Sequence, residues 1–251
     1  MYFLIWGWNW ITLTQTRISI VTLWAILLLI LLLSLPCLQI LDAPLIIIRK
    51  FFHFLCVFLF VPAVLYDNEL IYIAISVAFA LFVYVELLRI LSPPPFSFLH
   101  PLLTSFTDNR DNGYLILTHM SLLLGCAVPI WALEYFTNIP LEQRTVLRSS
   151  GIVVLGFGDS FAAIIGSLLG KIKIMNTHKT IEGYLGFTIS LFLALLFIEL
   201  EVSREISYAS IMKFSFISVM SGLCELFVKD VDNYILPLYI LNLFLAIQTK
   251  I

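Results

Sequence analysis

The sequence predicts an all-helical, polytopic membrane protein with about eight transmembrane helices. Two observations support this fold class. Of the 251 residues, 61% are hydrophobic and only 12% are charged, about half the charged share of an average globular protein. The apolar residues also form long runs, and a helix that crosses a bilayer needs about 20 of them. These runs do not alternate polar with apolar residues, as the strands of a membrane barrel do.

Eight stretches satisfy the requirements for length and composition. In chain order they are residues 18–41, 51–66, 70–91, 114–133, 149–169, 182–198, 208–228 and 233–247. A ninth stretch, 1–16, is free of charge and rich in Trp and Tyr. It is either an interfacial segment or a truncated ninth span, and the sequence leaves both readings open.

The distribution of basic residues suggests an orientation. If 18–41 is the first span, eight of the 14 Lys and Arg residues fall on one side of the membrane and six on the other. An excess of Lys and Arg marks the cytoplasmic side. The cytoplasmic set is expected to be Arg49, Lys50, Arg89, Arg110, Lys171, Lys173, Lys179 and Lys229.

One predicted span combines a row of small residues with a single acid. Residues 158, 162, 166 and 170 are Gly or Ala at a spacing of four. On a helix they form a smooth stripe where a neighbouring backbone can approach closely. Asp159 lies beside this stripe, and an acid inside a membrane span is costly and usually functional. The alternative is tight helix packing with Asp159 paired to a buried cation.

A basic connector follows this span. Lysines, a histidine and hydroxyl groups precede a helix that is expected to start near Ile181. Free backbone N–H groups at a helix start bind phosphate well. The candidate phosphate-binding residues are Gly158, Lys171, Lys173, His178, Lys179, Thr180 and Gly183. The alternative is an ordinary basic cytoplasmic loop.

Three further polar groups fall on the same predicted side. Asp108, Arg110 and Asp111 form either a turn or a polar lip over the site. Arg49, Lys50 and His53 are either a membrane anchor or part of the site. Glu225 and Asp232 flank the last connector. They are either part of the site, or a helix cap and a solvated turn. The four cysteines lie in apolar runs without metal-ligand spacing, so we interpret them as reduced packing residues.

Acids near lysines and a helix start suit phosphoryl transfer. Mg²⁺ is usually bound by one or two carboxylates together with the phosphates of a nucleotide, and positioning and charge neutralisation supply most of the catalysis. We therefore predict that at least two of Asp159, Glu182 and Asp232 converge near the phosphates and hold Mg²⁺. In a membrane protein this chemistry implies a lipid substrate.

Several of these motifs together resemble the dolichol kinase family. They are Gly156-Phe157-Gly158-Asp159-Ser160, Lys179-Thr180-Ile181-Glu182-Gly183, Arg49-Lys50-Phe51-Phe52-His53, and Asp232-Asn233 before Leu236-Pro237-Leu238. The resemblance runs from about Arg49 to the C-terminus. It implies a catalytic membrane domain over 49–251, with 1–48 as N-terminal membrane segment(s). Family members usually carry a further set of spans before the Arg-Lys-x-Phe-His element, whereas 48 residues precede it here.

The resemblance also implies the activity. The expected reaction is CTP-dependent phosphorylation of dolichol to dolichyl phosphate, which supports protein N-glycosylation, in the endoplasmic reticulum membrane with the site facing the cytosol. The expected catalytic residues are Asp159, Lys179, Glu182 and Asp232. The substrates are CTP and a polyprenol, with membrane lipids as surroundings; the net charge of −2 does not suggest nucleic acid. The alternatives are a cytidylyltransferase that makes a CDP-lipid, and a non-catalytic transporter or scaffold.

Overall fold

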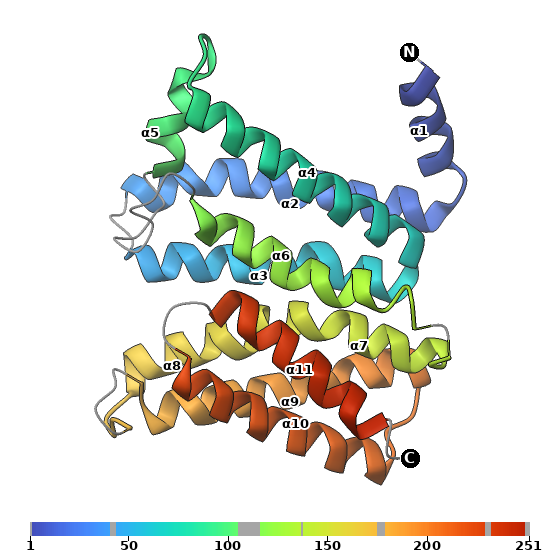
Figure 1. Cartoon of the computed structure of the whole chain (residues 1–251), viewed down its shortest axis with the longest axis vertical. Helices are drawn as coiled ribbons and strands as arrows, with labels where there is room; N and C mark the ends of the chain where they lie inside the picture. The colour runs from blue at the N-terminus through green and yellow to red at the C-terminus, as the bar shows by residue number, and fades with distance from the viewer. Residues whose placement is uncertain are drawn as a thin grey trace.

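The protein is a bundle of helices (Figure 1). The computed structural model describes residues 2–40, 44–104, 116–136, 138–174, 179–228 and 232–248. Within these ranges the regular structure is helical, apart from one isolated antiparallel bridge between Lys173 and Thr180. The all-helical fold class predicted from the sequence is therefore confirmed.

The helices follow one another with short connections. Their bounds are α1 Tyr2–Thr12, α2 Gln15–Ile40, α3 Leu45–Tyr66, α4 Asn68–Leu91, η1 Phe96–Phe98, α5 Leu99–Thr104, α6 Leu117–Ala132, α7 Leu141–Val153, η2 Val154–Asp159, α8 Ser160–Leu169, α9 Ile181–Ser203, α10 Tyr208–Phe227 and α11 Asp232–Gln248.

The predicted number of spans is only partly supported. Six helical stretches in the described ranges are long and apolar enough to cross a membrane: Gln15–Ser34, Ile46–Tyr66, Asn68–Leu91, Leu141–Leu169, Ile181–Ser203 and Tyr208–Phe227. Helices α6 and α11, at 16 and 17 residues, are shorter. At 1.5 Å per residue each is about 25 Å long, less than the roughly 30 Å hydrocarbon core. The count of eight is therefore not confirmed.

Several predicted elements have different bounds in the structure. Helix α3 begins at Leu45 rather than at 51, and α9 ends at Ser203 rather than at 198. The span expected at 149–169 begins at Leu141, because α7, η2 and α8 form one continuous helical run. The N-terminal stretch contains α1, an 11-residue helix about half as long as a span requires.

The helices are layered from α2 and α4 on one side, through α3 and α6, to α9 and α10 on the other (Figure 1). Helix α9 packs against α7, α8 and α10, and α3 packs against α7 and η2. Large side chains such as Phe187 of α9, Phe214 of α10 and Phe244 of α11 are fully buried in the core. The outer helix α2 instead presents Leu29, Leu32 and other exposed apolar side chains, as expected for a surface that faces lipid.

The helix ends that flank the basic connectors gather at one end of the bundle. The N-terminal ends of α3, α6, α9 and α11 lie there with the C-terminal ends of α8 and α10, at the left of Figure 1. The alternation predicted from the sequence is therefore present in the fold. As a result, polar motifs that are far apart in the sequence lie at the same end of the bundle (Figure 1).

At the opposite end of the bundle, one arginine links several helices. Arg17 on α2 donates through Nε to Asp67 Oδ2 at 2.7 Å and through a terminal nitrogen to Glu69 at 2.8 Å. Its guanidinium carbon also lies 3.7 Å from the centroid of the Trp10 ring. Asp67 accepts the backbone N–H of Leu70 at 2.9 Å and thereby caps α4. One cation thus joins α1, α2 and the α3–α4 junction.

We expect Asp67→Asn to lower stability at neutral pH but not at acid pH. Burial alone would raise the pKa of Asp67, but hydrogen bonds from Arg17 and the Leu70 N–H outweigh it, so this pKa lies below its ordinary value. The ionised carboxylate therefore stabilises the fold above about pH 4, its unfolded pKa, and this contribution is lost as the pH falls through the lowered pKa. Asparagine keeps the cap but not the charge, so the expected loss at pH 7 is about 1 kcal/mol or less.

Thermal unfolding of detergent-solubilised protein between pH 3 and 7 measures this difference. Glu69→Gln is the matched control, because the Glu69 side chain is 75% exposed and should matter little. A gap between parent and Asp67→Asn that persists unchanged at pH 3 contradicts the assignment.

Candidate active site

The first turns of α3 bring two basic side chains to one buried face. Lys50 and His53 are three residues apart and therefore lie on the same side of the helix. They are only 8% and 3% exposed, although both are polar. Burial of such groups inside a candidate span requires a partner.

That partner is Asp159, at the end of the π-helical segment η2. Asp159 is 5% exposed, and Oδ2 forms an ion pair with Lys50 Nζ and lies 3.3 Å from His53 Nε2. The sequence analysis left open that Asp159 pairs with a buried cation, and the structure shows that pairing. Single π-helical turns inside longer helices are rare and frequently mark functional sites.

Gly156 allows α3 and η2 to come this close. A Cβ atom at this position would lie 2.0 Å from Val57 Cγ2 and 3.3 Å from the His53 carbonyl oxygen. Any side chain would therefore push α3 away from η2. The absence of a side chain at Gly156 therefore permits the approach that brings Lys50 and His53 to the Asp159 carboxylate.

Two residues that the sequence analysis did not include in the site complete this cluster. Asn233 Oδ1 lies 3.4 Å from His53 Nε2, and Asn233 Nδ2 donates to Ser121 Oγ at 3.0 Å. Both side chains are buried. Asn233 could have been found because it directly follows Asp232 in a quoted motif, whereas Ser121 in an apolar run gave no signal. We refer to Lys50, His53, Asp159, Asn233 and Ser121 as the buried polar cluster.

The small-residue stripe lies where the sequence predicted it. A Cβ on Gly183 of α9 would lie 2.9 Å from the Ala162 carbonyl oxygen and 3.3 Å from Gly166 Cα. A Cβ on Gly158 would lie 3.0 Å from the Phe187 ring of α9, and one on Gly170 would lie 2.7 Å from Thr180 Cγ2. The prediction of close backbone approach is confirmed, and the approaching helix is α9.

The connector between α8 and α9 folds back on itself where it is described. The Ile181 N–H donates to the Ile172 carbonyl at 2.9 Å, and the Ile174 N–H to the Lys179 carbonyl at 2.9 Å. Thr180 caps α9 by accepting the Gly183 N–H at 3.1 Å. The predicted helix start is thus confirmed, but the expectation of free N–H groups is wrong for Ile181 and Gly183, because local partners already bind them.

The charged side chains of this turn differ in their surroundings. Lys171 and Lys173 are exposed, whereas Thr180 and Gly183 are buried. Both carboxylate oxygens of Glu182 lie 3.3 Å from the Ile172 nitrogen, so the acid accepts a backbone hydrogen bond.

Lys179 has a second acid as its partner. Its Nζ donates to Glu225 Oε1 at 2.6 Å and to the Val228 carbonyl at 2.9 Å, and it also contacts the Glu225 carbonyl. The lysine side chain is 26% exposed and that of Glu225 10%. Lys179 therefore binds the C-terminal end of α10, where a cation is favourable, and the structure brings it to Glu225.

Other predicted site residues cannot be placed. Asp108, Arg110, Asp111 and His178 lie outside the described residues, as does the side chain of Asp232. Arg49 lies on α3 one turn before His53, and its carbonyl oxygen lies 2.7 Å from His53 Nδ1. Within the described part of the chain, no three His, Cys, Asp or Glu side chains form a group able to hold a metal. The predicted convergence of Asp159, Glu182 and Asp232 stays a prediction.

Comparison with known proteins points to one family. The family model described as dolichol kinase matches residues 2–132. The chain is 38% identical to the dolichol kinase of Mus musculus over 212 residues, which covers 80% of this chain and 38% of the mouse protein. It is 38% identical over 203 residues to the dolichol kinase sec59 of Schizosaccharomyces pombe, covering 80% and 39%, and 32% identical over 205 residues to the dolichol kinase EVAN of Arabidopsis thaliana, covering 79% and 35%.

No solved structure matches the chain significantly. The matched region spans less than two fifths of the length of these relatives. Within the chain, however, the relatives match about four fifths of the residues and the family model more than half. The chain belongs to the dolichol kinase family.

Proposed function

We propose that this protein transfers the γ-phosphoryl group of CTP to dolichol, giving CDP and dolichyl phosphate. The relatives are named dolichol kinases, which supports the lipid substrate. The observation that carries the proposal is the ion pair of Lys50 and Asp159 with His53, buried between candidate membrane spans. Ionisable groups in such a place are costly and are usually functional.

Asp159 is the group that accepts the proton of the alcohol in this proposal, the role that an Asp has in protein kinases. Both ring nitrogens of His53 face acceptors: Nδ1 lies 2.7 Å from the Arg49 carbonyl oxygen, and Nε2 lies 3.3 Å from Asp159 Oδ2 and 3.4 Å from Asn233 Oδ1. His53 therefore presents no lone pair to the alcohol, and together with Lys50 it holds the carboxylate in position. As the proton of the dolichol O–H group passes to Asp159, the oxygen bonds to the γ-phosphorus and CDP leaves.

The lysines at the same end of the bundle suit the triphosphate. Lys171 and Lys173 are exposed and free to meet a nucleotide that arrives from water. Lys179 lies on the same turn, and a phosphate oxygen would compete with Glu225 for its ammonium. In this proposal the Lys179–Glu225 pair holds the lysine in position until the nucleotide binds.

The described acids fit Mg²⁺ as a partner of the nucleotide rather than as a closed protein site. Asp159 is already neutralised by Lys50, whereas the Glu182 carboxylate faces a backbone N–H. We propose that Glu182, together with Asp232, holds the ion, which neutralises phosphate charge when bound.

The products decide between the candidate reactions. Membranes containing this chain, incubated with dolichol and CTP labelled in the γ-phosphate, should yield labelled dolichyl phosphate and CDP. Release of pyrophosphate with a CDP-lipid would instead identify a cytidylyltransferase. CTP turnover no greater than in membranes without the chain would leave a transporter or scaffold.

The orientation is a separate proposal. The end of the bundle that carries the basic turn lies on the cytosolic side of the endoplasmic reticulum membrane. The excess of Lys and Arg at this end supports it. Lys173 is exposed, so Lys173→Cys in a variant whose native cysteines are replaced should react with an impermeant maleimide in sealed microsomes. A cysteine at exposed Tyr208, at the other end of the bundle, is the control and should react only after permeabilisation. The reverse pattern rules out this topology.

A further inference from the structure

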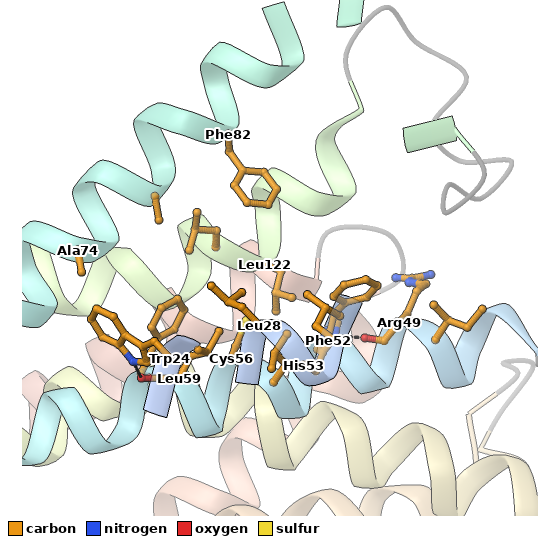
Figure 2. A pocket seen from close by; sticks show the side chains of 16 residues that line it. Trp24, Leu28, Arg49, Phe52, His53, Cys56, Leu59, Ala74, Phe82 and Leu122 are labelled. Atoms are coloured by element: carbon orange, nitrogen blue, oxygen red, sulfur yellow. Dashed lines mark hydrogen bonds between the residues drawn. The ribbon is translucent and has the colours of Figure 1, made fainter. Parts of the chain in front are cut away.

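An apolar cavity of about 360 Å³ lies between α2, α3, α4 and α6, on the other side of the bundle from the contact between α8 and α9. Figure 2 shows Trp24 and Leu28 of α2, Phe52 and Cys56 of α3, Phe82 of α4 and Leu122 of α6 around it. The lining runs along α3 from Ile48 to Phe60, about 18 Å at 1.5 Å per residue. Its size is that of a small-molecule site rather than a packing defect.

The polarity of the cavity is concentrated at one end. Among the lining residues, basic side chains come only from Arg49 and His53, one turn apart near the start of α3. The indole N–H of Trp24, further along, already donates to the Leu59 carbonyl at 2.6 Å. A molecule that fits must therefore be apolar along its length and polar at one end.

The polar end adjoins the buried polar cluster. His53 belongs to both, since it lines the cavity and its Nε2 lies 3.3 Å from Asp159 Oδ2. The cavity is also bordered by α2, whose exposed leucines face lipid, so a lipid can enter from the bilayer without crossing water.

We propose that this cavity binds the hydroxyl-bearing end of the prenol, with the alcohol beside Arg49 and His53 and the first isoprene units along α3. The inference rests on the proposed kinase function and identifies its lipid site. The cavity holds only the start of a long chain, so the remainder lies in the bilayer past α2. The cation of Arg49 also suits the negative phosphate of the product.

A second apolar groove, between α8 and α9, is the competing location. It is lined by Phe161, Ile189 and Ser190, and its ionisable side chain is Glu182. No member of the buried polar cluster lines this groove, whereas His53 of that cluster lines the cavity. Contact with the cluster therefore favours the cavity beside Arg49.

Photocrosslinking tests the site without requiring activity. A short prenol with a diazirine in its first isoprene unit is irradiated with membranes containing the full chain, in the absence of CTP. We expect labelled peptides from α2, α3 and α4, and protection by excess unlabelled dolichol. Labelling confined to α8 and α9, or labelling that excess phospholipid but not dolichol suppresses, overturns the proposal.

A cavity-filling variant gives the kinetic counterpart. Ala78→Phe on α4 should raise the KM for dolichol by about tenfold or more while leaving the KM for CTP unchanged, because it removes room for the lipid alone. Ser190→Phe fills the other groove and should leave both values near those of the parent. The opposite result for the two variants refutes the assignment. An inactive parent protein would refute the kinase proposal, and crosslinking would still report on the cavity.

Discussion

Replacement of Asp159 by asparagine is expected to remove nearly all CTP-dependent phosphorylation of dolichol. Asparagine keeps the shape of the side chain, but its neutral amide cannot accept the proton of the alcohol. Loss of a general base lowers the rate by about 10²–10⁴. The effect should fall on kcat, with the KM for CTP little changed, and it is measured by incorporation of labelled phosphate into lipid.

The same substitution should also destabilise the protein, since it leaves the Lys50 ammonium buried without its anionic partner. Breaking a buried ion pair from one side typically costs about 3–5 kcal/mol. A Lys50→Met/Asp159→Leu double variant separates the two effects, because an apolar pair of similar volume often restores stability. We expect it to recover abundance and thermal stability but not activity. Substantial activity in the double variant would show that the pair is structural.

The second large effect is expected at Lys179. Lys179→Ala should lower the rate by about 10²–10³ if its ammonium acts on the phosphates in the transition state. Lys179→Arg keeps the charge but has a planar, longer side chain, so its loss should be smaller. Phosphorylation at saturating dolichol and variable CTP measures both variants.

The structure changes one part of the expectation for this residue. A lysine in an open loop could be removed with little effect on stability, but Lys179 binds the largely buried Glu225 and the end of α10. We therefore expect Lys179→Ala to lower abundance as well. Lys179→Ala/Glu225→Gln removes both charges, so it should recover abundance while the rate stays low. Recovery of the rate in this double variant would mean that Lys179 has only a structural role, linking the turn before α9 to the end of α10.

The sequence by itself determined the fold class and several local features. Long apolar runs require helices because backbone groups in lipid must bond within their own segment. The spacing of Gly158, Ala162, Gly166 and Gly170 predicted a close helix contact, and α9 provides it. Thr180 before Ile181-Glu182-Gly183 correctly marked a helix start. These features depend on residues close together in the chain, so periodicity and capping rules suffice to find them.

Only the tertiary structure decided which charges meet. Lys50 and Asp159 are 109 residues apart, and Lys179 and Glu225 46 apart. Charge pairs between helices depend on how those helices pack, and packing is set by side-chain shape over the whole bundle rather than by local pattern. For the same reason, Ser121 and the apolar cavity beside His53 gave no signal in the sequence. The sequence indicated that Asp159 needs a partner; the approach of α3 over Gly156 determined that the partners are Lys50 and His53.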